Sequence, residues 1–157
     1  MEITKQTAKQ IYKNLPGWFQ ERLNDEFGED TFKEIDFTTF KTFNDLCIAC
    51  NITEKEFDEK WKNIPVDPDT VLYEKMKILS KAYNQDWIID HYNNSQKKWF
   101  PIFQVSASGF GFSYSGYDYG YTYSAVGSRF AFENESKSDH AGKTFTKLFE
   151  QFITNKL

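Results

Sequence analysis

The sequence predicts one α+β domain over residues 1–157, in which short helices precede an antiparallel sheet that a last helix covers. Three observations predict this class. Residues 1–98 are mainly helical in pattern, with apolar side chains three and four apart, whereas residues 99–132 alternate aromatic with very small side chains. Helical spacing returns near the C-terminus, so residues 99–157 hold the sheet and the last helix. Helices and strands in separate blocks are typical of α+β folds.

Two helices at the N-terminus are expected to form a helical hairpin. The first has its apolar face at Ala8, Ile11, Tyr12 and Leu15. The second begins beside Pro16, which suits a first helical turn, and ends at Gly28. Its apolar side is formed by Trp18, Phe19, Leu23 and Phe27.

Capping signals mark the start of the next two helices. Thr42 with Asp45 resembles a capping box, with Asp in the place of the usual Glu, and Thr53 with Glu56 is a standard one. The sequence therefore predicts one helix that carries the two cysteines and a second that runs to about Trp61.

A longer helix is expected to begin at Asp67-Pro68. Its buried stripe consists of Leu72, Met76, Leu79 and Tyr83. The periodicity then stops, and residues 84–98 are interpreted as a polar loop that Trp87 anchors in the core.

The stretch from Trp99 to Phe132 is the unusual part of the chain, because twelve of its 34 residues are aromatic. Phe110, Phe112 and Tyr114 alternate with Gly or Ser, as the two faces of a strand require. The alternation changes parity across Ser115-Gly116, where a turn or bulge must absorb one residue. Three to four antiparallel strands are predicted, at residues 100–107, 109–114, 117–124 and 127–133.

The last helix is predicted over residues 137–154, with Ser136 and Asp139 as its cap. Its apolar face is formed by Ala141, Phe145, Leu148 and Phe152. We therefore expect this helix to lie across one face of the sheet.

Charge and hydropathy exclude several classes of protein. The net charge is −4, and residues 1–98 hold 18 acidic and 14 basic side chains, with no basic patch in sequence. This pattern argues against binding to duplex DNA through phosphate contacts. No apolar run approaches the roughly 20 residues of a membrane helix, and no signal peptide is visible at the N-terminus. A cytoplasmic protein without membrane contact is expected.

Several segments carry a resemblance to a group of small proteins encoded by gut bacteria and their phages. These segments are YEKMKILSKAYNQDW (73–87), KKWFPIF (97–103), SGFGFSYSGYDY (108–119), VGSRFAF (126–132) and AGKTFTKLFEQF (141–152). The resemblance implies an accessory gene of a phage or mobile element, and it carries over no activity and no catalytic residue. The tyrosine-rich part from Tyr117 to Tyr123 departs from the pattern and is specific to this protein.

Cys47 and Cys50 form an isolated CxxC motif. Zinc would need two further ligands, which His91 and His140 supply only if distant segments meet. A redox pair usually lies at a helix N-terminus, whereas these cysteines fall near a helix C-terminus. The favoured interpretation is a pair of buried, reduced thiols, with no metal and no cofactor.

No motif predicts an enzyme. The chain has no GxSxG, P-loop or HExxH, and Gly109-Phe110-Gly111 lies within a strand pattern. Asp86, Asp90 and His91 could act as acid and base, but loop carboxylates are usually only solvated. No catalytic residue is therefore predicted.

Arg129 is one of two arginines, against seventeen lysines. In a strand it would project beside Gly127 and Ala131, where its planar fork could bind a carboxylate. The alternative is a structural ion pair with Asp118 or with a helix acid.

The tyrosines of the aromatic stretch allow three interpretations. They could pack as core, form an exposed surface for a protein partner, or stack on sugars or bases. The residues that the first function hypothesis assigns to binding are Tyr117, Tyr119, Tyr121, Tyr123, Asp118 and Arg129.

Two hypotheses of function remain. The first is a non-enzymatic binding protein whose tyrosine-rich, charge-poor surface engages a protein partner. The second is a binder of single-stranded nucleic acid or carbohydrate that uses the tyrosines as stacking platforms. The second would need a basic groove, for which Lys97, Lys98 and Arg129 are the nearest cations in sequence.

Overall fold

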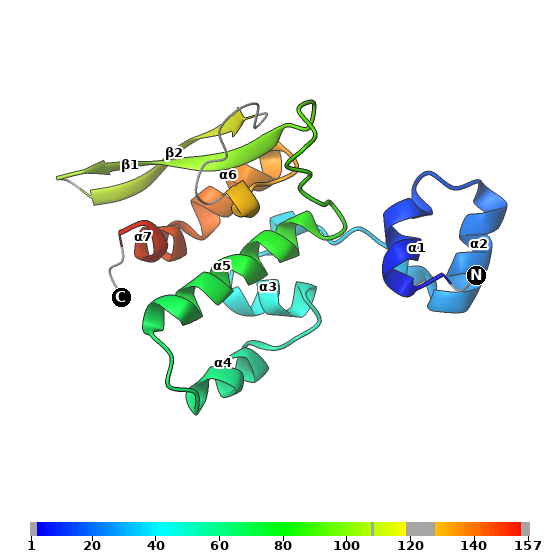
Figure 1. Ribbon diagram of the computed structural model, residues 1–157, viewed down its shortest axis with the longest axis horizontal. Coiled ribbons are helices and arrows are strands. Elements are labelled where there is room, and N and C mark those ends of the chain that lie inside the picture. The colour runs from blue at the N-terminus through cyan, green and yellow to red at the C-terminus, as the bar shows by residue number, and fades with distance from the viewer. Residues whose placement is uncertain (1–2, 108, 119–127, 155–157) are drawn as a thin grey trace. The chain divides into compact units, whose positions relative to one another are not determined.

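The computed structural model describes residues 3–107, 109–118 and 128–154, and it divides the chain into two compact units, Met1–Asp36 and Phe37–Leu157 (Figure 1). Both units contain helices, and the sheet belongs to the second. The α+β class is therefore confirmed. None of the helices in the described ranges is long and apolar enough to cross a membrane.

The first unit packs α1 (Lys5–Tyr12), α2 (Gly17–Phe27) and the 3-10 helix η1 (Glu29–Phe32). Tyr12 stacks on Phe32 with ring centroids 4.1 Å apart, and its hydroxyl donates a 2.9 Å hydrogen bond to Asn24. Gly28 ends α2 with a φ of 83°, as a left-handed cap position requires. The helices α1 and α2 lie in the two predicted regions, but their arrangement as a hairpin is not confirmed, and Trp18 is exposed rather than packed.

The second unit begins with the 3-10 turn η2 (Phe37–Thr39), followed by α3 (Phe43–Ala49), α4 (Glu54–Lys62) and α5 (Pro68–Asn84). Both capping boxes are formed, Thr42 with Asp45 and Thr53 with Glu56. Asp67 caps α5 by accepting from the N–H of Asp69. These three helix starts were predicted from the caps alone.

The sheet is an antiparallel hairpin of β1 (Lys98–Ser106) and β2 (Gly109–Asp118). Ile102 pairs with Tyr114 and Phe103 with Phe112, so Ser113 is the extra residue of a bulge. The sequence placed the parity change at Ser115-Gly116. It occurs two residues earlier, and Tyr117 belongs to the same continuous strand as Phe110.

The predicted sheet of three to four strands is not confirmed, because the described residues form two strands. Where a strand was expected, residues Ser128–Phe130 form the 3-10 helix η3, and Phe132 makes a single bridge to Trp99. The bonds to Phe132 use the N–H and C=O of Trp99, so the next residue of β1 facing this edge is Pro101. Proline has no N–H to donate, so the ladder ends after one pair.

The predicted last helix is two helices, α6 (Glu135–Thr144) and α7 (Thr146–Thr154), which lie beneath the hairpin in Figure 1. The hydroxyl of Thr146 donates a 2.6 Å bond to the carbonyl of Gly142, and such a side-chain bond competes with the helical ladder. The N-cap is Asn134, which accepts from the N–H of Lys137, and not the predicted Ser136.

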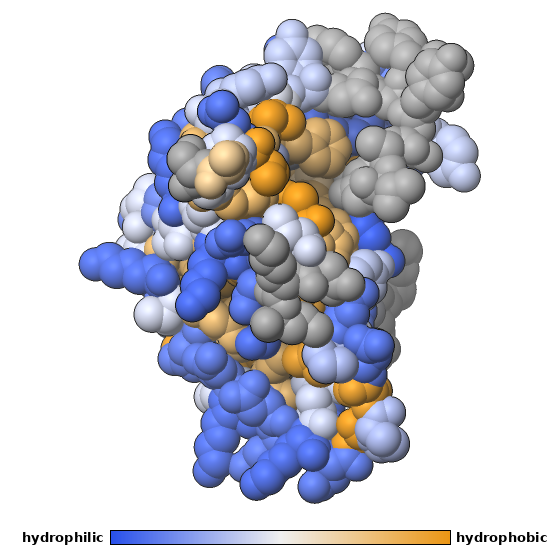
Figure 2. All heavy atoms as spheres, turned by 90° about the vertical axis from the view of Figure 1, so that its left-hand side faces the viewer, coloured by the Kyte–Doolittle hydropathy of each residue, from blue (hydrophilic) through white to orange (hydrophobic). Residues whose placement is uncertain are grey.

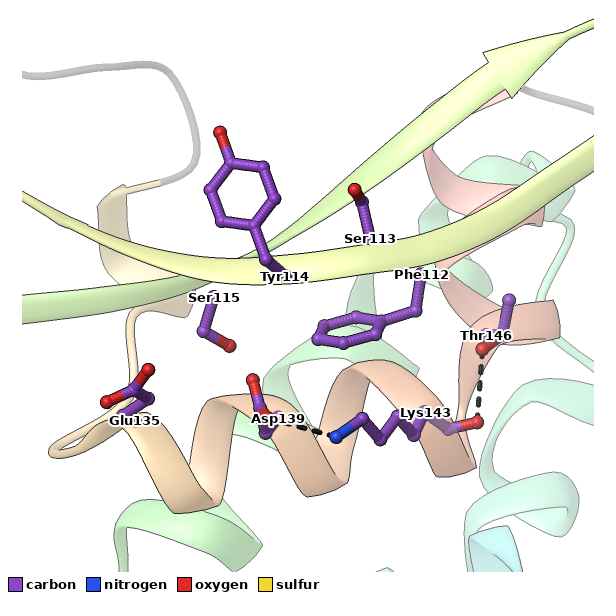
Figure 3. Close-up of a pocket in the computed structure, with 8 residues that line it drawn as sticks. All are labelled: Phe112, Ser113, Tyr114, Ser115, Glu135, Asp139, Lys143 and Thr146. Atoms are coloured by element: carbon purple, nitrogen blue, oxygen red, sulfur yellow. Dashed lines mark hydrogen bonds and ion pairs between the residues drawn. The ribbon is translucent and has the colours of Figure 1, made fainter.

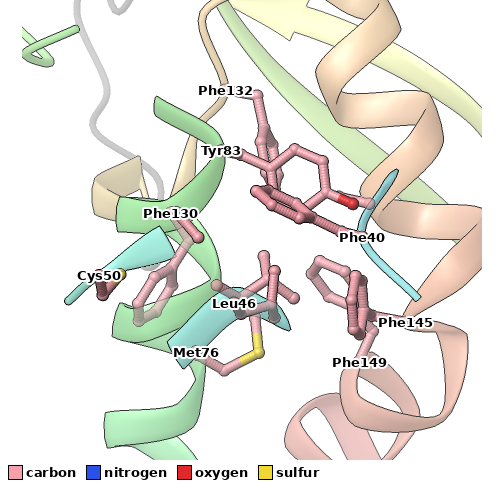
Figure 4. Close-up of a cluster of buried hydrophobic side chains, with 12 residues drawn as sticks. Phe40, Leu46, Cys50, Met76, Tyr83, Phe130, Phe132, Phe145 and Phe149 are labelled. Carbon is pink, nitrogen blue, oxygen red and sulfur yellow. The ribbon is translucent and has the colours of Figure 1, made fainter. Parts of the chain in front are cut away.

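The core lies between α5, α3, η3 and the α6–α7 pair (Figure 4). Tyr83 is at its centre, fully buried, with the rings of Phe40, Phe132 and Phe145 around it. Its hydroxyl shares a 2.7 Å hydrogen bond with His140 Nδ1. The stripe predicted for α5 is therefore the stripe that the core buries.

Candidate functional site

The hairpin exposes large apolar side chains. Tyr114 is 59% exposed and Tyr117 is 49% exposed, and Ile102 and Val105 of β1 are also exposed. One face of the hairpin packs on α6, and Figure 3 shows Tyr114 projecting from β2 on the side away from that helix. Figure 2 shows hydrophobic side chains at the surface at the level of the hairpin, whereas the surface at the level of α4 is hydrophilic.

Among the described residues, Trp99 and Lys97 hold Tyr117 in place. Its ring lies 4.8 Å from the ring of Trp99, its cross-strand partner, and the ammonium group of Lys97 lies 4.5 Å from the centre of its ring. Aromatic cross-strand pairs and cation–π contacts each stabilise such an arrangement. Tyr117 is thus a positioned, half-exposed ring.

The other tyrosines assigned to binding, Tyr119, Tyr121 and Tyr123, lie outside the described residues. The backbone of Asp118 pairs with Lys98 at the end of β2, and its side chain is also outside the described part. The described members of the predicted site are therefore Tyr117 and Arg129, which lie on different elements.

A groove runs between the second edge of β2 and α6 (Figure 3). Its volume is about 590 Å³, and it is lined from β2 by residues 112–115 and from α6 by Glu135, Asp139 and Lys143. Ser115 projects into it, and its hydroxyl shares a 2.8 Å hydrogen bond with the hydroxyl of Ser138. β2 pairs with β1 on one side, and no strand of the described chain pairs with its other side.

The groove contains two carboxyl side chains, Asp139 and Glu135. The hydroxyl of Ser115 and then the ammonium group of Lys143 lower the pKa of Asp139 below its ordinary value. Lys143 lies 3.0 Å from Asp139, and the same ammonium group lies over the ring of Phe112. Glu135 forms no hydrogen bond or ion pair with the described residues, so the open end of the groove is acidic.

Arg129 lies in η3 rather than in a strand, and it is exposed. Its guanidinium donates a hydrogen bond to the hydroxyl of Tyr73 and lies 5.4 Å from the centre of the Tyr73 ring. Among the described residues Arg129 forms no ion pair with a helix acid, and the side chain of Asp118, the other partner considered, lies outside them. Arg129 also lines a second cavity, beside the last turns of α5.

The loop residues considered for acid–base chemistry do not converge. Asp90 accepts a 2.9 Å bond from the N–H of Tyr92 and so closes a turn. Asp86, Asp90 and His91 are all exposed, and His91 also lines the cavity of Arg129. This geometry favours solvated loop carboxylates.

Both cysteines are buried, as predicted. Cys50 is the C-cap of α3, and its thiol lies 3.6 Å from the carbonyl oxygen of Ile78. Burial raises the pKa of Cys47 to about 11, and it also raises the pKa of Cys50. Among the described residues, no group of three or more His, Cys, Asp or Glu side chains is placed to hold a metal ion.

The raised pKa of Cys47 predicts slow reaction of its thiol with labelling reagents, and it predicts that the stability of the protein depends on pH. At pH 8 we expect a disulfide reagent to label Cys47 much more slowly in the folded chain than in urea, because the thiolate is the reactive form.

The folded state favours the neutral thiol of Cys47, so the free energy of unfolding should fall as pH rises from the ordinary thiol pKa of 9.0 towards 11. Urea titrations across that range measure it. The fall should be smaller in Cys47→Ala, and an equal fall in both proteins would contradict the assignment.

The groove of β2 and α6 was not predicted from the sequence. Glu135, Asp139 and Lys143 are four residues apart, so a shared helix face was readable, but the approach of Ser115 to that face depends on the bulge. Lys98 was named among the cations nearest in sequence for a basic groove. It is only 2% exposed, and its ammonium group donates to the carbonyl oxygens of Asn93 and Gln96.

Comparison of the chain with protein-family models, with curated proteins and with solved structures gives no match.

Proposed function

We propose that this chain is a non-enzymatic binding protein that engages a protein partner through its tyrosine-bearing hairpin, as an accessory protein of a phage or mobile element. The observation that carries the proposal is the edge of β2, which has no strand partner in the described chain, borders an open groove and belongs to a hairpin with exposed tyrosines. The phage or mobile-element context rests on the sequence resemblance alone.

The backbone of β2 is suited to binding an extended segment. Since Trp99 directs its N–H and C=O away from β2, its partner Tyr117 directs the same groups towards the second edge. Ser115, opposite Pro101, does so as well. A partner strand would satisfy these groups, and strand addition to a sheet edge is a general mode of peptide recognition.

The side chains beside this edge supply the contacts that such a partner needs. Tyr114 and Tyr117 provide rigid, amphipathic rings with few rotatable bonds to order. Glu135 and Asp139 make the groove acidic, so a partner with a basic side chain next to its strand fits best. Tyr119, Tyr121 and Tyr123 follow β2 in sequence and belong to the same proposal.

The alternative, stacking on single-stranded nucleic acid or carbohydrate, has less support. A nucleic-acid groove needs cations that face solvent. Lys98 is buried, Lys143 is paired with Asp139, and the carboxylates beside β2 would repel phosphates.

A photo-crosslinking residue at Ser113, which is exposed beside Tyr114, tests the proposal. We expect a protein from a host lysate to crosslink from this position and not from position 55 on α4. Tyr114→Ser and Tyr117→Ser should each reduce the affinity for the purified partner by roughly thirtyfold, since a buried anchor contributes about 2 kcal/mol. Tyr119→Ser with Tyr121→Ser extends the measurement along the chain.

Tyr92→Ser is the matched control, because Tyr92 is 96% exposed on the loop before the hairpin. Its affinity for the partner should equal that of the unchanged protein. Thermal melting of every variant separates lost binding from lost folding. A partner that binds Tyr114→Ser and Tyr117→Ser unchanged, or crosslinking to nucleic acid alone, would reject the proposal.

A further inference from the structure

A cavity of about 550 Å³ lies between the second half of α5, the segment that follows it, and η3. α5 ends at Asn84, and Gln85 adopts a φ of 49°, which reverses the chain. The N–H of Trp87 then donates a 2.8 Å bond to the carbonyl of Asn84. Residues 87–89 consequently return beside the helix and wall the cavity. We call it the Arg129 cavity.

The Arg129 cavity is positively charged in a protein whose net charge is −4. Among the described residues that line it, Lys77, Lys81 and Arg129 are the cations and Glu74 is the only carboxylate. Lys77 is paired with Glu74 at 2.7 Å. Lys81 is exposed, and its ammonium group forms no hydrogen bond or ion pair with the described residues. Two positive charges are therefore left over in one concave site.

Arg129 is positioned for recognition. Its contact with the hydroxyl and ring of Tyr73 orients the guanidinium group and brings no carboxylate to it. The guanidinium retains donors beyond the one bonded to Tyr73. A fixed guanidinium fork suits bidentate binding of phosphate or carboxylate.

The remaining walls are apolar. Trp87, Ile88 and Ile89 lie on the returning segment, and Phe130 follows Arg129 on η3. A volume in this range accommodates a small organic molecule, and sites of this kind combine apolar walls with a few placed polar groups.

We propose that the Arg129 cavity binds an aromatic phosphate monoester, with its phosphate on Arg129 and Lys81 and its ring against Trp87. The charge decides between the two anions that an arginine fork recognises. A phosphate monoester carries about −1.5 to −2 at neutral pH, which matches the surplus of two, whereas a carboxylate carries −1. The site lies on elements other than the β2 groove and does not depend on the proposed protein partner.

Titration calorimetry of the full chain with phenyl phosphate tests the proposal, together with NMR of the Trp87 indole N–H, assigned through Trp87→Phe. We expect binding that shifts the Trp87 signal and weakens with added salt. Arg129→Gln and Lys81→Gln should each reduce the affinity by about tenfold or more, as loss of a charge-assisted hydrogen bond does. Inorganic phosphate and benzoate should bind more weakly than phenyl phosphate.

Lys55→Gln, on α4, is the matched control and should bind phenyl phosphate as the unchanged protein does. If Arg129→Gln lowers the melting temperature, Lys81→Gln decides, because Lys81 is exposed. Absence of phenyl phosphate binding, equal binding by Lys81→Gln, or equal affinity for benzoate or inorganic phosphate would each overturn the assignment.

Discussion

Replacing Gly142 by Ala should lower the free energy of unfolding by about 2 kcal/mol, the range found for overpacked interiors. A Cβ at this position would lie 2.4 Å from Cδ2 of Phe112 and 2.8 Å from Cβ of Pro101. Ala favours a helix over Gly by about 1 kcal/mol, which offsets only part of the overlap. The hairpin must therefore move away from α6, and urea denaturation measures the cost.

Gly116 of β2 is the matched control. A Cβ there would lie 3.7 Å from the nearest atom, which is ordinary contact, so Gly116→Ala should change stability little. Combining Gly142→Ala with Phe112→Leu should cost less than the sum of the single changes, since the two side chains compete for one space. A Gly142→Ala protein of unchanged stability would show that α6 does not approach the hairpin this closely.

Tyr83→Ala should cost about 4 kcal/mol, as truncation of a fully buried aromatic side chain does. The ring of Tyr83 contacts the rings of Phe40, Phe132 and Phe145, so its removal opens a cavity that three separate segments of the chain line. Many domains have little more stability than this. We expect a folded fraction that is strongly reduced at 37 °C, measured by thermal and urea melting.

Tyr83→Phe separates the ring from its hydroxyl. Burial raises the pKa of Tyr83 far above its usual range, so the phenol stays protonated and bonded to His140. Loss of this one hydrogen bond should cost about 1 kcal/mol, and the ring should account for the rest. If Tyr83→Phe were as unstable as Tyr83→Ala, the hydrogen bond rather than the packing would hold the core.

The helices could be predicted because their signals are local. Thr53 with Glu56, Asp67-Pro68 and the stripe that ends at Tyr83 each define an element within a few residues. The break at Phe145 could not be predicted in this way, because apolar residues keep their helical spacing from Ala141 to Phe152. The break depends on the hydroxyl of Thr146, which bonds the carbonyl of Gly142. In a helix a threonine hydroxyl can either make such a bond or face solvent, and the sequence does not decide between them.

The strands depend on partners, which a sequence does not specify. The alternation around Phe130 and Phe132 is a valid strand pattern, but a third strand needs an edge with free donors, and Pro101 withholds one. The surroundings of the binding residues could likewise be predicted only in part. Tyr117 is half-exposed, as its strand pattern allows. Arg129 contacts Tyr73 of α5, which lies more than fifty residues away in sequence and could not be identified as its neighbour.

The bulge at Ser113 and the break at Phe145 belong to one curved shape. On the side of the bulge towards the hairpin tip, Phe103 packs on Phe149 of α7. On the other side of the bulge, Ser115 forms a hydrogen bond with Ser138 of α6. A bulge bends and twists its strand, so the hairpin follows the change of helix beneath it. An insertion or deletion near Ser113 would straighten the hairpin over a bent helix pair, and one near Phe145 would straighten the helix pair under a bent hairpin. During evolution the two irregularities are therefore expected to be kept or lost together.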